Sequence, residues 1–186
     1  MKLYKNKMSA GATPLHKIAS WPEFRWPWLL LALAATGLVI AALFMQHVQE
    51  LNPCEQCIYQ RTAMIGIALF AWLGFLMPQL MLARIVAYAG WLYSAWAGYG
   101  AAAHHLWLQR DANPLFHSCA AIPSFPSWAP LHEWLPSVFA ITGVCGDDGW
   151  RFLSLNMPEW MRVIFAIFLA IGVVTLLIRI VYARKI

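Results

Sequence analysis

Four apolar stretches, each about twenty residues long, limit the fold of this chain more than any other feature. They cover residues 28–45, 58–77, 85–103 and 161–178; the first is uncharged, and Arg61 interrupts the second near its start. A helix of about twenty apolar residues crosses a hydrocarbon layer about 30 Å thick. Only 11% of the 186 residues are charged, which is roughly half the share found in soluble domains. We therefore expect an all-α membrane protein, a bundle of four transmembrane helices, rather than a soluble enzyme.

Basic and acidic residues lie on opposite sides of these stretches. Nine of the thirteen Lys and Arg residues lie in the N-terminal tail, in the connection between the second and third stretches, or in the C-terminal tail. Seven of the eight acidic residues lie in the other two connections. Because basic segments of membrane proteins stay in the cytoplasm, we expect both termini to be cytoplasmic and the other two loops to lie outside. The net charge of +5 thus sets orientation and does not indicate nucleic-acid binding.

These arguments predict a single membrane domain over residues 1–186. The cytoplasmic parts are a tail (1–26), a turn (78–84) and a second tail (179–186); the spans are 27–48, 58–77, 85–103 and 160–178; the external loops are 49–57 and 104–159. Small residues recur every four positions in the third span, at Gly90, Ser94, Gly98 and Ala102. Such a stripe lets helix backbones approach closely, so it predicts a helix-packing seam.

All four cysteines lie in or beside the two external loops. Cysteines pair in an oxidising compartment, and four of them allow three pairings. We favour Cys54–Cys57 and Cys119–Cys145, because the C-x-x-C segment closes the shortest ring. An inert role is reasonable for the second pair, whose bridge would stabilise the fold by about 3.5 kcal/mol. The first pair encloses too little chain for that role, and its spacing is typical of redox-active dithiols.

The residues around the C-x-x-C segment favour redox chemistry over metal binding. No second C-x-x-C or H-x₃-H motif accompanies it, so we expect no zinc site. Cys57 begins the second span, where a helix N-terminus favours a thiolate, and Arg61 lies one turn deeper on the same face. This arginine either snorkels to the headgroups or points into the bundle, where it would stabilise a Cys57 thiolate or a reduced acceptor. Glu55 opposes that effect, because a neighbouring carboxylate raises the pKa of a thiol.

A dithiol that is reoxidised in a membrane needs an electron acceptor. The sequence has no G-x-G-x-x-G motif for a nicotinamide or flavin, and no histidine pair within the spans for haem. A lipid-soluble quinone reaches the outer end of a helix bundle without a nucleotide-binding fold. His105, at the outer end of the third span, is a candidate to hydrogen-bond or protonate a quinone oxygen. His104 and His47 lie at similar depth, and a role as a simple polar anchor is the alternative for all three.

Several segments of the chain form a specific set when they are taken together. They are Gln46-His47-Val48, Pro53-Cys54-Glu55-Gln56-Cys57-Ile58-Tyr59-Gln60-Arg61, Trp91-Leu92-Tyr93-Ser94-Ala95, Phe125-Pro126-Ser127-Trp128-Ala129-Pro130-Leu131, Trp134, Pro136, and residues 143–160. This set resembles the DsbB family of bacterial disulfide bond formation proteins, and the similarity extends over residues 28–178.

The resemblance implies a function and a role for each cysteine. Proteins of this family oxidise DsbA, a soluble periplasmic thiol oxidase, and pass two electrons to ubiquinone or menaquinone. On this chain, Cys119 would form the mixed disulfide with the partner, and Cys145 would then exchange with Cys54. Cys57 would face the quinone.

The resemblance also assigns Arg61 and His105 to the quinone site. It places the protein in the bacterial inner membrane, with the active loops in the periplasm. Two alternatives stay open at this point. One is a related oxidase that serves a single dedicated DsbA-like partner, and the other is a non-enzymatic membrane scaffold with structural disulfides.

Overall fold

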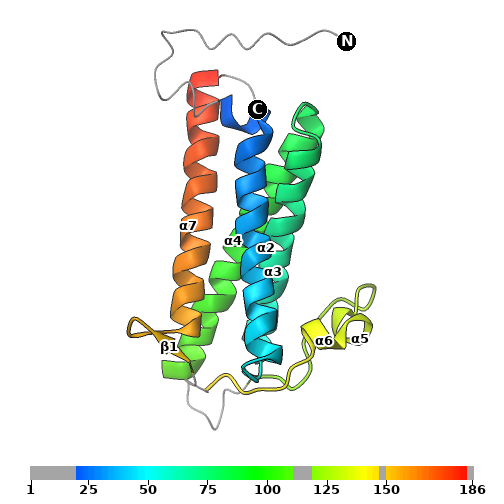
Figure 1. Cartoon of the computed structure of the whole chain (residues 1–186), viewed down its shortest axis with the longest axis vertical. Helices are drawn as coiled ribbons and strands as arrows, with labels where there is room; N and C mark the ends of the chain where they lie inside the picture. Colours follow the sequence, from blue (N-terminus) through cyan, green and yellow to red (C-terminus); the bar gives the residue numbers. More distant parts are fainter. Residues whose placement is uncertain (1–19, 111–118, 147–149, 184–186) are drawn as a thin grey trace.

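Four long helices pack side by side into one bundle (Figure 1). This is a computed structural model, and the residues it describes are 20–110, 119–146 and 150–183. The long helices are α2 (Arg25–His47), α3 (Glu55–Leu76), α4 (Met81–Arg110) and α7 (Met157–Ile178). Most of the two tails expected at the chain ends, residues 1–19 and 184–186, falls outside the described residues.

Three helices in the described part of the chain have the length and hydropathy of membrane spans. They are α2, α3 and α7, and the apolar segment of α7 continues to Val181. Helix α4 is less hydropathic because tryptophan, tyrosine, glycine and serine take many of its positions. Its 30 residues give a helix about 45 Å long, against about 30 Å for the hydrocarbon core. The chain is therefore a helical, multi-pass membrane protein.

The small-residue stripe of α4 contacts two neighbouring helices. A Cβ atom added at Gly90 would overlap the ring of Phe70 on α3, and one added at Gly98 would overlap the ring of Phe165 on α7. Phe165 is completely buried. The predicted packing seam is thus confirmed, and it holds α4 between α3 and α7 because glycine leaves room for an aromatic ring at each contact.

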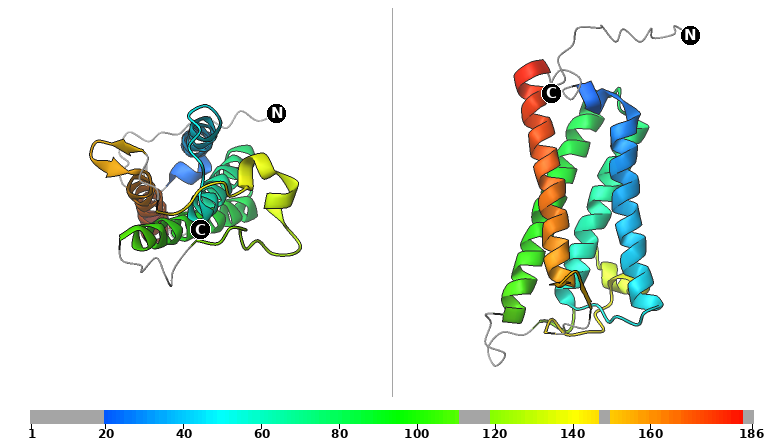
Figure 2. Two further views of the ribbon diagram at one scale, coloured as in Figure 1. Left: turned by 90° about the horizontal axis from the view of Figure 1, so that it is seen from below. Right: turned by 60° about the vertical axis from the view of Figure 1, so that its left-hand side comes forward.

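Both described chain ends lie at the same end of the bundle (Figure 2). Aromatic and charged contacts close this end. The short helix η1 (Trp21–Glu23) precedes α2, and the π-helical turn η2 (Arg179–Ala183) follows α7. The buried guanidinium of Arg179 contacts the carboxylate of Glu23 at 3.2 Å. The rings of Trp28 and Tyr88 pack edge to face with centroids 5.2 Å apart. The first contact ties η1 to η2, and the second ties α2 to α4.

The connection between α4 and α7 lies at the other end, and its described residues, 119–146 and 150–156, contain little regular structure (Figure 1). It includes two single-turn helices, α5 (Leu131–Trp134) and α6 (Pro136–Phe139), and a hairpin of β1 (Arg151–Phe152) and β2 (Leu155–Asn156). The sequence did not predict the hairpin. Its turn residues, Leu153 and Ser154, have φ values of 49° and 67°, a conformation that glycine or asparagine usually adopts. No turn signal was therefore visible in the sequence.

Candidate functional site

The first turn of α3 presents the two cysteines of the C-x-x-C segment. Cys54 is the N-cap residue, and its sulfur accepts a hydrogen bond from the backbone N–H of Cys57 at 3.4 Å. The two sulfur atoms lie 2.9 Å apart and are not bonded to each other. The sequence predicted a disulfide for this pair, and the structure instead has the adjacent dithiol, which is the reduced form of the same pair.

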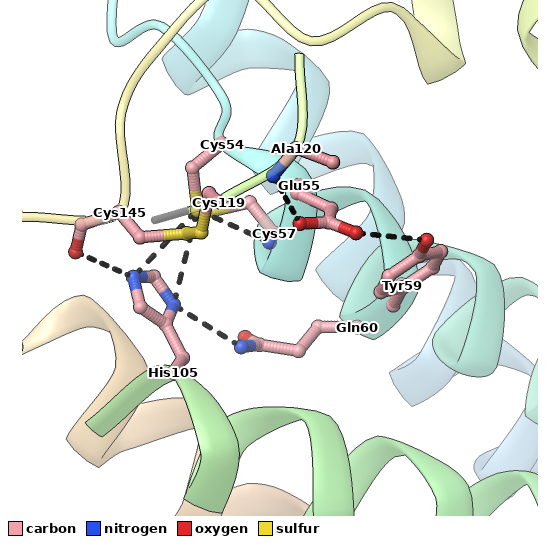
Figure 3. The surroundings of a disulfide bond; sticks show 9 residues. All are labelled: Cys54, Glu55, Cys57, Tyr59, Gln60, His105, Cys119, Ala120 and Cys145. Carbon is pink, nitrogen blue, oxygen red and sulfur yellow. Dashed lines mark hydrogen bonds between the residues drawn. A yellow bond between two sulfur atoms is a disulfide. The ribbon is translucent and has the colours of Figure 1, made fainter. Parts of the chain in front are cut away.

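Cys119 and Cys145 form the other expected disulfide (Figure 3). The two cysteines differ in exposure, because Cys145 is buried whereas Cys119 is only partly buried. The sulfur atoms of Cys54 and Cys145 and a ring nitrogen of His105 all lie within 4.8 Å of one another. The disulfide of the long loop therefore lies directly against the dithiol of α3.

Backbone hydrogen bonds between the two loops produce this proximity. The N–H groups of Thr142 and Gly143 both donate to the carbonyl of Pro53, each at 3.0 Å. Gly143 is needed at this contact, since an added Cβ would overlap the backbone carbonyl of Asn52. The loop segment before Cys145 is thereby held to the residue before Cys54.

His105 extends from α4 into the cysteine cluster, as Figure 3 shows. Its side chain is buried, and its Nε2 lies 3.3 Å from the carbonyl of Cys145 and 3.6 Å from the sulfur of Cys54. A carbonyl only accepts hydrogen bonds, so these partners assign the proton to Nε2, while Nδ1 accepts from Gln60 at 3.4 Å. His104 instead faces outward and stacks on Trp107. Of these two adjacent histidines, the structure thus brings only His105 to the cysteines.

The third histidine named by the sequence, His47, contacts the long loop at α6. It is exposed, and its Nε2 lies 3.0 Å from the backbone carbonyl of Ser137. This contact ties the end of α2 to α6 in the long loop. The polar-anchor role therefore describes His47 well.

The surroundings of Cys54 determine which sulfur keeps a proton. The Cys57 sulfur, 2.9 Å away, raises the pKa of the Cys54 thiol above its ordinary value, and burial raises it further. A single proton between two close sulfurs therefore resides on Cys54, which donates it to Cys57. Cys57, the less buried of the two, is left as the sulfur that accepts the hydrogen bond.

Arg61 points into the bundle instead of toward the headgroups. It is 6% exposed, and its Nη1 donates to the side-chain oxygen of Gln46 at 2.6 Å and to the carbonyl of Val138 at 2.5 Å. The guanidinium therefore joins α2 and α3 to the long loop. Among the described residues, no atom accepts a hydrogen bond from its buried Nε. Because buried polar groups usually have a partner, this donor marks the guanidinium as a candidate contact for a bound molecule.

A cavity of about 150 Å³ lies between the cysteines and Arg61. Apolar side chains from α2, α3 and α7 form most of its wall, and polar groups meet at one side. Six of the lining residues are Leu38, Val39, Met64, Met161, Gln60 and His105. A cavity of roughly 150 Å³ lined by apolar side chains accommodates a benzene-sized ring. The site can therefore hold a small ring whose polar atoms face the arginine and the histidine.

The cluster of Cys54, His105 and Cys145 also has the donor types of a soft metal site. Cys145 is bonded to Cys119, and a disulfide sulfur is not a thiolate ligand. Two free ligands then remain in this trio, fewer than a structural zinc site needs. The arrangement fits sulfur exchange better than metal binding.

Sequence reasoning missed several residues that shape this site. Gln46 and the carbonyl of Val138 hold Arg61, and Gln60 holds His105. No spacing rule connects α2, α3 and residue 138, so these partners were not predictable without the fold. Gln60 follows Cys57 by three residues on the same helix, and helical periodicity was the one signal that could have placed it near the site.

A helical membrane bundle with a dithiol and a disulfide in contact at one end defines a membrane thiol–disulfide oxidoreductase. The family model described as "Disulfide bond formation protein DsbB" matches residues 24–175. The chain is 46% identical over 164 residues to Disulfide bond formation protein B of Idiomarina loihiensis, covering 88% of this chain and 91% of the relative. It is 47% identical over 169 residues to that of Pseudoalteromonas atlantica, covering 91% and 98%. The chain belongs to the DsbB family, which gives it a role in disulfide bond formation.

Proposed function

We propose that this protein reoxidises a periplasmic thiol oxidase of the DsbA type and passes the two electrons to a membrane quinone. The observation that carries the proposal is the contact between the two cysteine pairs, with Cys54 and Cys145 sulfurs within 4.8 Å. Thiol–disulfide exchange requires one sulfur to attack another directly. Two inert structural bridges have no need of such a contact.

The cycle begins at Cys119, the more exposed sulfur of the loop disulfide. A thiolate of the reduced partner attacks Cys119, the Cys119–Cys145 bond breaks, and Cys145 leaves as a thiolate. Cys145 then attacks Cys54 of an oxidised Cys54–Cys57 pair. The new Cys54–Cys145 bond releases Cys57 as a thiolate.

Two further exchanges restore the loop disulfide. The second thiolate of the partner attacks its own cysteine in the mixed disulfide, which releases the oxidised partner and the Cys119 thiolate. Cys119 then attacks Cys145, so the Cys119–Cys145 bond re-forms and Cys54 leaves as a thiolate, which takes up a proton that the partner's thiols had released. The result is a loop disulfide with a Cys54/Cys57 dithiol, which is the combination found in this structure.

The residues of the cavity fit a quinone head group. A quinone, ubiquinone or menaquinone, supplies an acceptor for two electrons and two protons. The apolar wall suits its ring, and the free Nε donor of buried Arg61 suits a quinone oxygen. His105 Nε2–H is a second donor at the same cavity, 3.6 Å from the Cys54 sulfur. Arg61 would hold the head group in place, and His105 would keep a proton close to the departing sulfur.

We further propose that all four long helices cross the bacterial inner membrane. The spans would be residues 27–48, 58–77, 85–103 and 160–178, with both termini cytoplasmic and loops 49–57 and 104–159 periplasmic. The distribution of Lys and Arg supports this orientation. The figures support it as well, because both described chain ends lie at the end of the bundle opposite the α2–α3 and α4–α7 connections (Figures 1 and 2).

The decisive experiment mixes the purified protein with reduced DsbA and a soluble ubiquinone analogue and follows quinone absorbance. We expect catalytic quinone reduction, its loss in Cys57→Ser, and no mixed disulfide with DsbA in Cys119→Ser. Normal turnover in either variant would contradict the relay. Assaying several DsbA-like partners side by side separates a general oxidase from one dedicated to a single partner.

A further inference from the structure

Glu55, the residue between Cys54 and Gln56, makes an unexpected contact with the long loop. One carboxylate oxygen, Oε2, accepts a hydrogen bond from the backbone N–H of Ala120 at 2.7 Å. The other, Oε1, accepts from the hydroxyl of Tyr59 at 3.1 Å. Both contacts are drawn in Figure 3, where the carboxylate points toward Ala120 and Tyr59. The sequence predicted that Glu55 would act on the thiols through its charge, yet its hydrogen bonds go to the loop.

Tyr59, which is hydrogen-bonded to Glu55, makes its own contacts with the long loop. Its hydroxyl oxygen accepts a hydrogen bond from the backbone N–H of Ser124 at 2.8 Å. Its ring packs edge to face on Phe125, with centroids 6.1 Å apart. Glu55 and Tyr59 lie one helical turn apart on the same face of α3. Together they hold a segment of the loop, residues 120–125, through two backbone amides and one aromatic ring.

The position of this segment matters because Ala120 directly follows Cys119. Disulfide exchange needs the attacking and leaving sulfurs in line, so a misplaced disulfide reacts slowly even when the thiolate is present. On the other side of the disulfide, the Pro53 carbonyl already holds Thr142 and Gly143. The Glu55 contact fixes the other segment of the loop, the one that follows Cys119. A carboxylate acceptor makes this hydrogen bond stronger than a neutral acceptor would.

We propose that Glu55 and Tyr59 are positioning residues that dock the segment after Cys119 on the first turn of α3 and so align the loop disulfide with Cys54. This inference rests on the proposed exchange between the two cysteine pairs. In this proposal the Glu55 carboxylate docks the loop through its shape and its hydrogen bonds. The competing explanation is that Glu55 acts through its negative charge on the neighbouring sulfurs.

Three substitutions separate docking from charge. Glu55→Gln removes the charge and keeps an oxygen that accepts from Ala120, whereas Glu55→Ala removes both. Tyr59→Phe keeps the charge and removes the hydroxyl that joins Glu55 to Ser124. If docking is the role of Glu55, then Glu55→Ala and Tyr59→Phe lose protection of the loop amides and turnover, whereas Glu55→Gln largely keeps both. If Glu55 acts through its charge, the two Glu55 variants lose turnover equally and Tyr59→Phe keeps wild-type turnover.

The first readout is independent of catalysis. Amide hydrogen exchange of the oxidised protein in detergent, followed by mass spectrometry of a peptide that contains residues 120–124, reports the two docked amides. We expect faster exchange in this peptide for Glu55→Ala and Tyr59→Phe, and near wild-type exchange for Glu55→Gln. Wild-type amide hydrogen exchange of this peptide in both Glu55→Ala and Tyr59→Phe would overturn the proposal. This result stands whether or not the protein reduces quinone, so it distinguishes a failure of docking from a failure of the proposed function.

The second readout is turnover with reduced DsbA and a ubiquinone analogue. We expect kcat to fall roughly tenfold in Glu55→Ala, the size associated with losing a hydrogen bond to a charged group, with KM for DsbA unchanged and the activity restored in Glu55→Gln. Matched controls are Glu133→Ala, an exposed acid of the same loop, and Tyr93→Phe, an exposed tyrosine of α4; both should match wild type. Equal losses in the two Glu55 variants, with Tyr59→Phe normal, would instead assign the effect to charge and reject docking.

Discussion

The backbone N–H of Gly143 donates to the carbonyl of Pro53 at 3.0 Å, and this bond sets Cys145 beside Cys54. Pro53 precedes Cys54 by one residue, and Gly143 precedes Cys145 by two. A small displacement at this hydrogen bond therefore moves the two sulfur atoms relative to each other. Because a Cβ on Gly143 would overlap the Asn52 carbonyl, the contact between the loops depends on a residue without a side chain. A backbone contact of this kind is invisible to any motif search for reactive side chains.

Gly143→Ala should therefore separate the two cysteine pairs. Overpacking typically costs about 1–3 kcal/mol, and here the loop is free to relieve it by moving away from Pro53. We expect quinone reduction with reduced DsbA to fall about tenfold, a change equivalent to roughly 1.4 kcal/mol in the barrier. Gly146→Ala is the matched control, since an added Cβ there meets no described atom within 4 Å. Equal rates for the two variants would contradict this role of Gly143.

The helix seam predicts a loss of stability that is separate from catalysis. Gly98→Ala places a methyl group against the buried ring of Phe165, so we expect a destabilisation of about 1–3 kcal/mol and a lower midpoint of thermal unfolding in detergent. Gly100→Ala is two residues away on the same helix and meets open space among the described residues. Its midpoint should stay constant or rise, because alanine is favoured over glycine in a helix by roughly 0.5–1 kcal/mol.

The hydrogen bond between the two inner sulfurs predicts how Cys54 titrates. In a Cys119→Ser/Cys145→Ser background, the neighbouring Cys57 sulfur and burial keep the pKa of Cys54 above its ordinary value, so its thiolate is scarce at pH 8. Adding Cys57→Ser removes the first of these causes. The pKa of Cys54 then falls, and its alkylation should begin at lower pH. Mass spectrometry of alkylated peptides across a pH series measures the midpoint, and an unchanged midpoint would show that burial alone controls this thiol.

Arg61→Lys tests whether the cavity beside Arg61 binds a quinone. Lysine keeps the positive charge but lacks the planar fork that reaches Gln46 and Val138 while leaving Nε free. We expect KM for the ubiquinone analogue to rise about tenfold, equivalent to roughly 1.4 kcal/mol, with mixed-disulfide formation to DsbA unchanged. Arg162→Lys, on exposed α7 surface beside Tyr99, is the control. A rise in KM of the same size in that control would show that the effect is not specific to the cavity.

Apolar stretches were enough to predict the long helices, because burial in lipid imposes a length and a composition on each span. The Cys119–Cys145 bond followed from ring size, and the family followed from short motifs around Cys54 and Cys57. The cavity could not be predicted in the same way, since Gln46, Val138 and Arg61 meet only after three elements have packed. Only the charge of Glu55 entered the prediction, because the orientation of a side chain cannot be read from a sequence.

The redox state of this structure has a consequence for the order of events. With Cys119 and Cys145 bonded and Cys54 and Cys57 reduced, an arriving partner would still find a disulfide to attack. The Cys145 sulfur it released would, however, meet a thiol where the next step requires a disulfide, so the electrons of that partner would stay on Cys119 and Cys145. Under the proposed relay, repeated oxidation of the partner therefore depends on reoxidation of Cys54 and Cys57, and in its absence the chain would store one pair of electrons on each cysteine pair and then stop.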